Sequence, residues 1–442
     1  MSNDADVLII GGGVIGSAIA YFLCSSSDFD GKVVVLEQDP SYQFASTPRS
    51  LGGIRLQYSV PENIAIAKFG LEFYASAAER LAVDGEGPVL GFREAGYLIL
   101  ASASGQALLD ENLTVQRDEG VDTLRLYQAA LAARFPWLNV SDLAVGAFGA
   151  RNEGWIDPYA LLQGFRRKAV SLGADYREAR VVGLQRAGAR IISVELEGGD
   201  VVNCDTVVNA AGARAHQIAQ MAGTDLPVRP RKRQIVRFEC RTTIPDCPLV
   251  FDPTGLYFRP EGAGFICGMS PKPENDPDCL DFEMDHDLFE RDLWPMLAHR
   301  VPAFEAIKAN GGWTGHYAFN VLDQNALLGY HDAYDNLVLA NGFSGHGVQQ
   351  SPAVGRAISE LLIYGHYRTL DLTRLGYQRV VQDQPLVERN IDCAATLVLD
   401  KASWRVVKTW AAGCWPDQEK GDCCQSPFLI PTVLPRTNEI VC

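Results

Sequence analysis

The apolar residues of this chain are gathered into short uninterrupted runs, the pattern of strands that are buried on both faces. Residues 6–10 form the first run, a glycine loop and a helical stretch over residues 17–23 follow it, and residues 33–36 form the second run. Strand, helix and strand within about 30 residues make a βαβ unit, and parallel strands covered on both faces explain the continuous apolar runs. The beginning of the chain therefore predicts a parallel sheet flanked by helices.

The same kinds of element return further along the chain. Helical periodicity covers residues 61–81 and 158–172, and residues 204–209 form another apolar run. Residues 336–340 form a further apolar run, which is followed by a second glycine loop and a helix over residues 352–364. Pieces of a parallel sheet are thus expected at the start, in the middle and near the end of the chain.

The segments between these pieces have a different pattern of apolar and polar residues. Residues 228–270 alternate apolar and polar side chains between Gly and Pro, which predicts antiparallel strands. We therefore predict an α/β fold of two interleaved, discontinuous domains. A parallel-sheet domain takes residues 1–88, 150–222 and 322–391, and a mostly antiparallel domain takes residues 89–149 and 223–321. No structure is predicted for the tail at residues 392–442, where the pattern breaks down.

The composition is that of an ordinary globular protein. Its 442 residues are 47% hydrophobic and 21% charged, and the chain is long enough to bury two cores. A net charge of −15 and a pI near 5.0 argue against a nucleic-acid partner or an anionic membrane surface. No apolar run approaches the ~18 residues of a membrane-spanning helix, so no membrane span is expected.

Compartment and metal binding are inferred from the N-terminus and from the cysteines. No basic segment precedes the first apolar run, so a cleavable signal is not expected. The 11 cysteines then indicate reduced thiols and a cytoplasmic location. They show no CxxC spacing, the seven histidines form no close pair, and no metal site is predicted.

The glycine loop after residue 10 carries the first chemical signal. Gly11, Gly13 and Gly16 form a GxGxxG motif, in which one glycine makes a tight turn, one admits a pyrophosphate and one lets helix and strand pack closely. The N-terminus of the following helix offers free N–H groups to the phosphates. Glu37 ends the second strand 21 positions after Gly16, the offset of an acid that binds ribose hydroxyls and disfavours a 2′-phosphate. Residues 6–37 therefore predict a Rossmann-like domain for a dinucleotide other than NADP.

Four stretches taken in order indicate which dinucleotide is bound. Residues 6–37, Ser46 to Tyr58 (STPRSLGGIRLQY), Val208 to Arg214 (VNAAGAR) and Asn341 to Gln350 (NGFSGHGVQQ) resemble the D-amino-acid oxidase-like FAD oxidoreductases. Within them the sarcosine oxidase, sarcosine dehydrogenase and glycine oxidase branch is the most similar, over about residues 5–391. The resemblance implies FAD, and an NAD-dependent dehydrogenase is the alternative. The predicted cofactor contacts are Gly11, Gly13, Val14, Ile15, Gly16, Glu37, Ser46, Thr47, Ser50, Gly52, Gly53, Val182, Ala211, Gly212, Gly342, Phe343, Ser344, Gly345, His346, Gly347 and Gln349.

Three of these stretches also have a physical interpretation of their own. Ser46 to Gly53 combines small and hydroxyl residues with two glycines, which suits backbone beside a flat ring or a plain surface loop. Asn209 to Gly212 widens into small residues, which leaves room for a cofactor or for a close helix–strand contact. Backbone N–H groups of Gly342 to Gly347 can stabilise negative charge, as in an oxyanion hole. The resemblance places this loop at the N1–C2=O edge of a reduced flavin, and composition alone permits another anion loop.

The resemblance also suggests residues that contact substrate. Arg55 stands where sarcosine oxidases have an arginine that pairs with the substrate carboxylate, and its planar fork suits bidentate binding; a surface arginine is the alternative. Tyr257 and Arg259 alternate along one strand and share a face, where they line the substrate side of the flavin or serve as ordinary strand residues. Tyr317 is interpreted in the same way. His346 is either a structural histidine or a contact to flavin or substrate.

Three departures from that branch qualify the prediction. Gln349 takes the place of a second basic residue, and Ile266 takes the place of a lysine that helps oxygen react. The electron acceptor is therefore either O2 or another carrier, and the enzyme either an oxidase or a dehydrogenase. No cysteine lies in Gly312 to Asn325 for covalent attachment, so non-covalent FAD is expected.

Together these features predict oxidation of the C–N bond of an amino acid or N-substituted amino acid. Hydride would pass to flavin N5 and the imine would hydrolyse, with Arg55 on the carboxylate and Tyr257 and Tyr317 as aromatic walls. A second hypothesis is that the chain only binds FAD. Its FNVLDQN and GFSGHGVQQSPAVGRA stretches resemble superfamily members that assist the assembly of respiratory complex I. In that case FAD stabilises the fold, and the surface carries the function.

Overall fold

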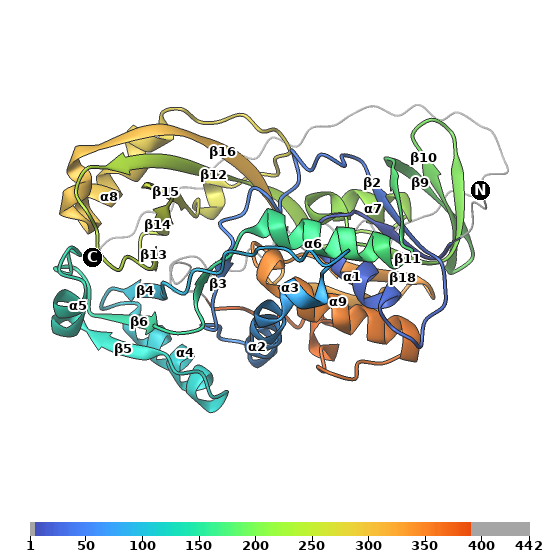
Figure 1. The fold of residues 1–442 in the computed structure, drawn as a ribbon, viewed down its shortest axis with the longest axis horizontal. Helices are drawn as coiled ribbons and strands as arrows, with labels where there is room; N and C mark the ends of the chain where they lie inside the picture. The colour runs from blue at the N-terminus through green and yellow to red at the C-terminus, as the bar shows by residue number, and fades with distance from the viewer. Residues whose placement is uncertain (1–4, 390–442) are drawn as a thin grey trace, which may run out of the picture. The chain divides into compact units, whose positions relative to one another are not determined.

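The computed structural model describes residues 5–389, and two eight-stranded sheets organise them (Figure 1). One sheet is mainly parallel and the other is mostly antiparallel, so the predicted α/β fold class is confirmed. The tail at residues 392–442 and the last residues of the predicted parallel-sheet domain lie outside the described residues.

The parallel sheet is built from the apolar runs of the sequence. Its strands include β1 (Ala5–Ile10), β2 (Val33–Glu37), β8 (Asp175–Glu178), β11 (Val201–Asn209) and β18 (Leu337–Asn341), in the order β17-β18-β11-β1-β2-β8. Ile9 of β1 pairs with Val35 on one side and with Val208 on the other, both in parallel register. Antiparallel strands complete the sheet: β17 (Leu327–Tyr330) beside β18, and the hairpin of β9 (Val181–Ala187) and β10 (Arg190–Leu196) beside β11. Because β1, β2, β11 and β18 are parallel, the loops that follow them meet at one edge.

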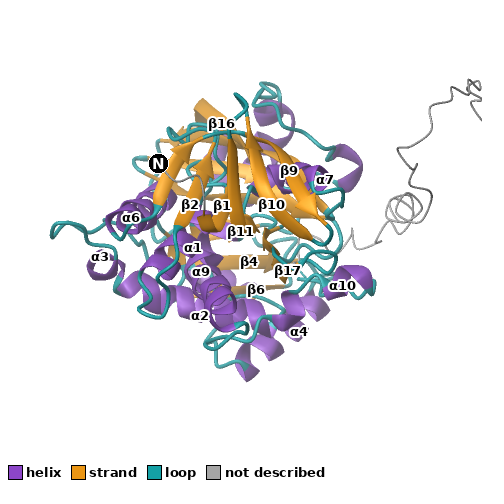
Figure 2. Ribbon diagram, turned by 90° about the vertical axis from the view of Figure 1, so that its right-hand side faces the viewer, coloured by secondary structure: helices purple, strands orange, loops and turns teal. Residues whose placement is uncertain are grey.

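Helices α1 (Val14–Cys24), α6 (Pro158–Ser171) and α9 (Gly347–Tyr364) lie on one face of this sheet (Figure 2). Their apolar side chains form one core with Val7 and Ile9 of β1 and with Val33 and Val35 of β2. α1 and α9 approach so closely that a Cβ atom at Gly355 would lie 2.7 Å from Ala18 Cβ. This tight layer holds the N-terminus of α1 beside the end of β1.

The helix predicted over residues 61–81 is interrupted. It consists of α2 (Pro61–Ala75) and α3 (Ala77–Arg80), and Ser76 separates them. The Ser76 hydroxyl donates to the carbonyl oxygens of Glu72 (3.3 Å) and Phe73 (3.4 Å), which competes with a continuing helix.

The predicted start of the helix near Pro352 is wrong, because α9 begins at Gly347. Pro352 has no N–H to donate to the Val348 carbonyl oxygen. This oxygen instead accepts hydrogen bonds from Ser351 Oγ (2.8 Å) and Tyr74 Oη (3.3 Å). Neighbouring hydroxyl groups thus allow the helix to run through the proline and to start next to the second glycine loop.

The second sheet contains the antiparallel strands predicted in the middle of the chain. Its order is β16-β12-β15-β14-β13-β4-β6-β5, and every neighbouring pair is antiparallel except β13 and β4. The strands are β4 (Tyr97–Ala101), β5 (Leu124–Tyr127), β6 (Val145–Gly149), β12 (Val228–Cys240), β13 (Leu249–Phe251), β14 (Leu256–Glu261), β15 (Gly264–Met269) and β16 (Ile307–Asn320). Phe238, Phe258 and Phe304 form its core with Leu297 of α8 (Trp294–Arg300).

Shorter elements connect or cover the two sheets. They are β3 (Gly53–Ile54), which pairs with β7 (Gly154–Trp155), and the helices α4 (Gln106–Asp118), α5 (Gln128–Arg134), α7 (Ala215–Met221) and α10 (Gln378–Val381). All strands of the second sheet fall within residues 97–149 and 228–320. The domain boundaries themselves stay a prediction.

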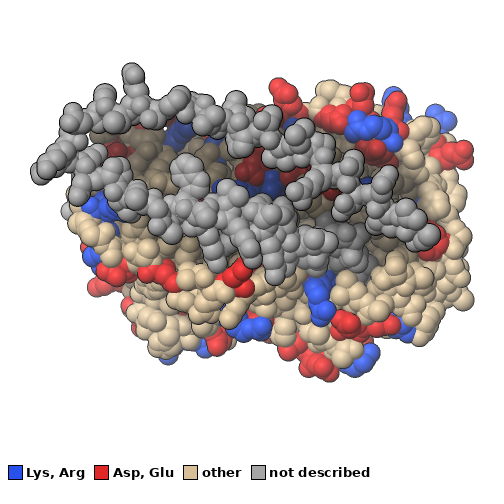
Figure 3. Space-filling model, turned by 180° about the vertical axis from the view of Figure 1, so that it is seen from behind, with Lys and Arg blue, Asp and Glu red and all other residues tan. Residues whose placement is uncertain are grey.

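Charged side chains of both signs are mixed over the uncovered part of the face in Figure 3. Within residues 5–389 no helix is long and apolar enough to cross a membrane. The same residues contain no group of three or more His, Cys, Asp or Glu side chains that could hold a metal ion.

Arg300 connects separate parts of the second sheet's core. Its Nη1 and Nη2 atoms donate to the Asp142 carboxylate at 2.8 and 3.0 Å, and its Nε atom donates to Asp252. The side chains of Arg300 and Asp252 are only 1% and 2% exposed. The hydrogen bond from Arg300 lowers the pKa of Asp142 to about 2. Removal of the arginine would leave the Asp252 carboxylate buried without its cation.

We predict that Arg300→Met lowers the free energy of unfolding by about 3–5 kcal/mol, the cost of an uncompensated buried charge. Arg291→Met is the matched control, because Arg291 is 53% exposed in its pairs with Asp285 and Asp292; no measurable change is expected there. Denaturant titration followed by circular dichroism gives both values. Equal losses in the two variants would contradict an anchoring role for Arg300.

Candidate active site

The first part of the site is the loop between β1 and α1. Gly11 has a φ of +102°, and a Cβ atom there would lie 2.4 Å from the Ala210 carbonyl oxygen. A Cβ atom at Gly16 would lie 1.9 Å from the Gly11 carbonyl oxygen, so both positions require glycine. At Gly13 the nearest atom to the Cβ position is Thr47 Oγ1 at 3.8 Å, and this N-cap residue has no side chain that would fill the space before α1. The N-terminus of α1 is therefore open to the close approach of an anion.

Glu37 lies beside this loop at the end of β2. Its carboxylate accepts hydrogen bonds from the N–H groups of Gly12 and Asp39, each at 2.9 Å. Burial raises the pKa of the Glu37 carboxyl. The Ala179 N–H donates to the Glu37 carbonyl oxygen at 2.9 Å, so β9 begins close by. Val182 of β9 has a side chain that is 46% exposed.

The loop from Ser46 to Gly53 starts at the same place. Thr47 Oγ1 accepts a hydrogen bond from the Val14 N–H at 3.3 Å and so attaches this loop to α1. The side chains of Val14 and Ile15 are 4% and 8% exposed and belong to the core, so these residues can contact a cofactor only through their backbone. Ser46 is exposed at the start of the loop.

Arg259 of β14 holds the second half of this loop. Its Nε and Nη2 atoms donate to the Leu51 carbonyl oxygen at 3.1 and 2.9 Å, and its Nη1 atom donates to the Pro260 carbonyl oxygen and to Glu261. The guanidinium group of Arg259 thus bonds the protein itself, and its role beside the substrate stays a prediction. Within the loop the Ser50 hydroxyl oxygen accepts from the Gly52 N–H at 3.1 Å, and Gly53 enters β3.

A groove of about 350 Å³ lies next to this loop. It is lined by Ser41, Tyr42, Gln43, Pro48, Arg49, Tyr159 and Trp313. The Tyr42 hydroxyl lies 3.2 Å from the Cβ position of Gly12, so the groove borders the glycine loop. A concave surface of this kind beside an open helix N-terminus suits an extended anionic cofactor.

The loop from Gly342 to Gly347 connects β18 to α9 at the same edge of the parallel sheet. Ser344 and Gly345 have φ values of +50° and +98°, and the Ser344 N–H donates to the Ala318 carbonyl oxygen of β16 at 2.9 Å. Phe343 forms an isolated bridge with Phe319 of the same strand. The loop is therefore fixed between the two sheets.

Two further predicted residues come from the segment after β11 and from β16. Gly212, directly after Ala211 at the end of β11, has a φ of +55° and no described atom within 4 Å of its Cβ position, so open space lies beside it. Tyr317 of β16 packs its ring against Gly345, where a Cβ atom would lie 2.6 Å from the ring. The Arg233 guanidinium carbon lies 5.0 Å from the centre of that ring.

Arg55 lies in a turn that follows β3. Its Nη2 atom is 3.0 Å from His346 Nε2, and its guanidinium carbon is 4.4 Å from the ring centre of Tyr58 and 5.8 Å from that of Tyr97. Gln349 of α9 holds the backbone of this residue. Its Oε1 atom accepts from the Arg55 N–H at 3.1 Å, and its Nε2 atom donates to the Arg55 carbonyl oxygen. The structure thus brings together Arg55, His346 and Gln349.

The contact with Arg55 determines the tautomer of His346. A guanidinium group only donates, so His346 Nε2 must accept and carries no proton. Burial, and then the charge of Arg55, lower the pKa of the imidazole to about 3, so it is neutral near pH 7 with its proton on Nδ1. This Nδ1 atom and Tyr257 Oη are both buried and have no hydrogen-bond partner within the described part of the chain. Two donors at the site are therefore left for a bound molecule.

The second sheet supplies an apolar wall. Tyr257 and Ile266 belong to one buried cluster against which Leu51 packs. The rings of Tyr97 and Phe251 stack with centres 5.4 Å apart, and those of Phe251 and Tyr257 with centres 5.2 Å apart. This row of rings runs from Arg55 towards Tyr257. Ile266 is 1% exposed and adds no charge to the wall.

Two buried carboxylates were missed by sequence analysis. Glu153 accepts hydrogen bonds from the Leu56 N–H and from Gln57 Nε2, both at 2.7 Å, and Glu388 accepts from the Ser59 N–H at 2.6 Å. Both side chains are 1% exposed. A single acid in a loop has no spacing that distinguishes it from a solvated one. Only burial next to the Arg55 turn identifies these two.

Known proteins similar to this chain are found by sequence and by structure. The sequence model of the family described as FAD dependent oxidoreductase matches residues 6–361. FAD-dependent oxidoreductase domain-containing protein 1 of Xenopus laevis is 42% identical over 423 residues, which are 88% of this chain and 85% of that protein. 4-Methylaminobutanoate oxidase (formaldehyde-forming) of Paenarthrobacter nicotinovorans is 26% identical over 374 residues, which are 81% of this chain and 43% of that protein.

The solved structure of L-proline dehydrogenase from P. horikoshii has the same fold. It aligns with a TM-score of 0.76 and 25% identity over 87% of this chain and 100% of that one. The family match extends from the first glycine loop to α9, and so includes all four stretches on which the predicted resemblance rests. This chain belongs to the D-amino-acid oxidase-like family of FAD-dependent oxidoreductases.

Proposed function

We propose that this protein oxidises the C–N bond of a small carboxylate that carries an amino or N-substituted amino group. The observation that carries this proposal is the pair of Arg55 and His346. The half-buried Arg55 cation lies beside an imidazole whose Nδ1–H has no partner among the described residues. Such a pair matches a carboxylate ligand, which has two acceptor oxygens and one negative charge.

FAD is the proposed cofactor, and the residues present fit it. The open N-terminus of α1 suits the pyrophosphate, and Glu37 suits the ribose hydroxyls. The space beside Gly212 and the backbone of Gly342 to Gly347 suit the flavin end. When bound, the flavin supplies the hydride acceptor. No covalent link to the protein is proposed.

The chain's own residues bind and orient the substrate. Arg55 holds the carboxylate, and the His346 Nδ1–H donates to it or to the adjacent cofactor edge. Tyr97, Phe251 and Tyr257 exclude water from the reacting carbon. Support for this substrate class comes from two relatives, since L-proline and 4-methylaminobutanoate are both carboxylates with a secondary amine.

The proposed electron acceptor is inferred from the apolar wall that contains Ile266. Ile266 places no cation near the cofactor that would stabilise negative charge on oxygen. This favours a dehydrogenase with another electron carrier over an oxidase that uses O2.

The six cysteines of the described residues are free, in keeping with a reducing compartment such as the cytoplasm.

The proposal is tested by anaerobic reduction of the flavin. Sarcosine, other N-methyl amino acids, and L- and D-amino acids including proline are added in turn, and the loss of flavin absorbance is measured. We expect at least one carboxylate amine to reduce the flavin. Arg55→Ala should weaken its binding about 100-fold, because charge-assisted hydrogen bonds are lost. Arg80→Ala, on exposed α3, should leave binding unchanged.

A panel that leaves the flavin oxidised would overturn the proposed activity. If the protein then bound a respiratory-complex subunit tightly, the assembly hypothesis would take its place. Reduction with equal substrate affinity in wild type and Arg55→Ala would retain the activity and reject Arg55 as the anchor.

We predict that Glu37→Ala weakens FAD binding about 10–100-fold, because the carboxylate that accepts hydrogen bonds from two ribose hydroxyls is lost. Glu178→Ala is a matched control, since Glu178 pairs with Glu37 in register on β8 but is exposed. Flavin fluorescence during titration of the apoprotein gives both affinities. Equal weakening in the two variants would contradict the role of Glu37.

The ionisation of Glu153 should make carboxylate binding depend on pH. Burial raises the pKa of Glu153 to about 7 against the lowering effects of Gln57, Leu56 and Arg55. Below pH 7 the group is neutral, and above pH 7 its charge repels a bound carboxylate and weakens the hold of Arg55. The dissociation constant of benzoate should therefore rise several-fold from pH 6 to pH 8 in wild type and stay constant in Glu153→Gln. A parallel rise in both proteins would contradict this role.

A further inference from the structure

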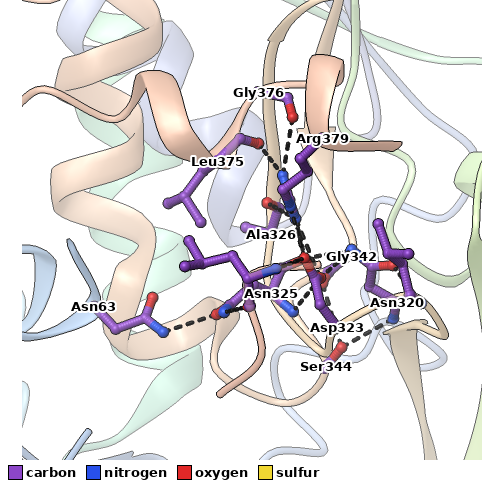
Figure 4. A network of polar contacts seen from close by, with 12 residues as sticks. Asn63, Asn320, Asp323, Asn325, Ala326, Gly342, Ser344, Leu375, Gly376 and Arg379 are labelled. Atoms are coloured by element: carbon purple, nitrogen blue, oxygen red, sulfur yellow. Dashed lines mark hydrogen bonds and ion pairs between the residues drawn. The ribbon is translucent and has the colours of Figure 1, made fainter. Parts of the chain in front are cut away.

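A buried ion pair lies between the second sheet and the C-terminal part of the described chain (Figure 4). The Asp323 carboxylate accepts from Arg379 Nε at 2.7 Å and Nη2 at 3.2 Å, and from Asn320 Nδ2 at 3.0 Å. The N–H groups of Asn325 and Leu386 donate to it at 3.1 and 3.0 Å. The side chain of Asp323 is 0% exposed and that of Arg379 is 6% exposed. Every acceptor site of this buried charge is thus occupied by the protein.

One branch leads from Asp323 to the loop at the start of α9. Asn320, which donates to Asp323, also donates its backbone N–H to Ser344 Oγ at 2.9 Å (Figure 4). The Ser344 hydroxyl donates in turn to the Gly342 carbonyl oxygen at 3.3 Å. Ser344 has a φ of +50°, a conformation that a residue with a side chain rarely adopts. These bonds hold the loop in a shape that its backbone alone does not favour.

The other branch leads to the Arg55 turn. Asn325 Oδ1 accepts from Asn63 Nδ2 at 2.7 Å, and Asn63 Nδ2 also donates to Glu388 Oε2 at 2.8 Å. Glu388 Oε1 then accepts from the Ser59 N–H at 2.6 Å. Asn325, Asn63 and Glu388 are each 1% exposed. A continuous chain of buried polar contacts therefore links the Gly342 to Gly347 loop with the turn that carries Arg55.

Stability alone is a weak reason for such a network. Burial of charged and amide groups costs desolvation free energy, and apolar side chains of similar volume often stabilise a core as well or better. A fully bonded network instead selects one arrangement of the groups that it joins. The two ends of this network lie at the Gly342 to Gly347 loop and at the Arg55 turn, which are the two halves of the proposed site.

We propose that Asp323 and Asn63 are positioning residues that hold the cofactor loop and the carboxylate anchor in one fixed arrangement. Neither residue contacts the proposed ligand; each acts through Ser344 at one end and Ser59 at the other. The roles given to the Gly342 to Gly347 loop and to the Arg55 turn rest on the proposed function. The coupling between these two segments does not depend on that function, because it is a property of the folded chain.

The test measures amide hydrogen exchange in the full-length, FAD-bound protein. Asn63→Ala removes two donated hydrogen bonds and one accepted from Gln350 (3.1 Å). Asn336→Ala is the matched control, because Asn336 is 2% exposed and also donates twice (both 2.7 Å) and accepts once (2.9 Å). Its partners are Ile191 of β10 and Asp205 of β11, and Asn336 precedes β18 at the end opposite to the Gly342 to Gly347 loop.

In Asn63→Ala we expect peptides covering residues 342–347 to exchange about tenfold faster or more, although the mutated side chain does not contact them. The control should not change exchange there. Unchanged exchange at residues 342–347 in Asn63→Ala, or equal acceleration in the control, overturns the proposal.

Ser344→Ala tests the coupling from the other end if Asn63→Ala does not fold. It removes one hydroxyl and should speed exchange at residues 55–60; unchanged exchange at this turn overturns the proposal. Benzoate affinity, measured by the flavin absorbance change, should fall about fivefold in the same variant. A wild-type protein that binds no carboxylate would show that the proposed function is wrong, while the exchange data would still decide the coupling.

Discussion

The parallel register of β1 with β2 and β11 is the constraint on which the site depends. Because β18 continues the same register, the loops after Ile10, Glu37, Asn209 and Asn341 meet at one edge of the sheet. They come from positions more than 300 residues apart in the sequence. The close packing of α1 on α9, through Gly355 and Ala18, keeps two helix N-termini at this edge. Without this register the glycine loop and Glu37 would be unconnected motifs.

The second sheet supplies the aromatic side of the site. It brings a row of stacked rings, Tyr97, Phe251 and Tyr257, to the side of the Arg55 turn. Arg259 fixes the Leu51 carbonyl oxygen and so attaches this wall to the loop from Ser46 to Gly53. The candidate site is thus apolar on one side and polar on the other.

The Arg55 turn is held by buried polar side chains. Gln349, Glu153 and Glu388 bond its backbone from three different parts of the chain. At the position of Gln349, a related branch of enzymes has a basic residue. The Gln349 amide bonds the backbone of Arg55 on both sides, so it orients the remaining cation and does not replace the missing one.

The sequence by itself determined the βαβ start, the alternation of the second sheet, the glycine loops and the family, because each is a local pattern of residue types. It also predicted Arg55, His346 and Gln349 as site residues from motifs in two short stretches, and the structure brings the three together. It did not reveal Glu153, Glu388, Asn63 or the pair of Asp323 and Arg379. These roles depend on burial and on partners far away in the chain. A lone acid or amide has the same local signature in solvent as in a core, so only the tertiary structure decided which of them hold the site together.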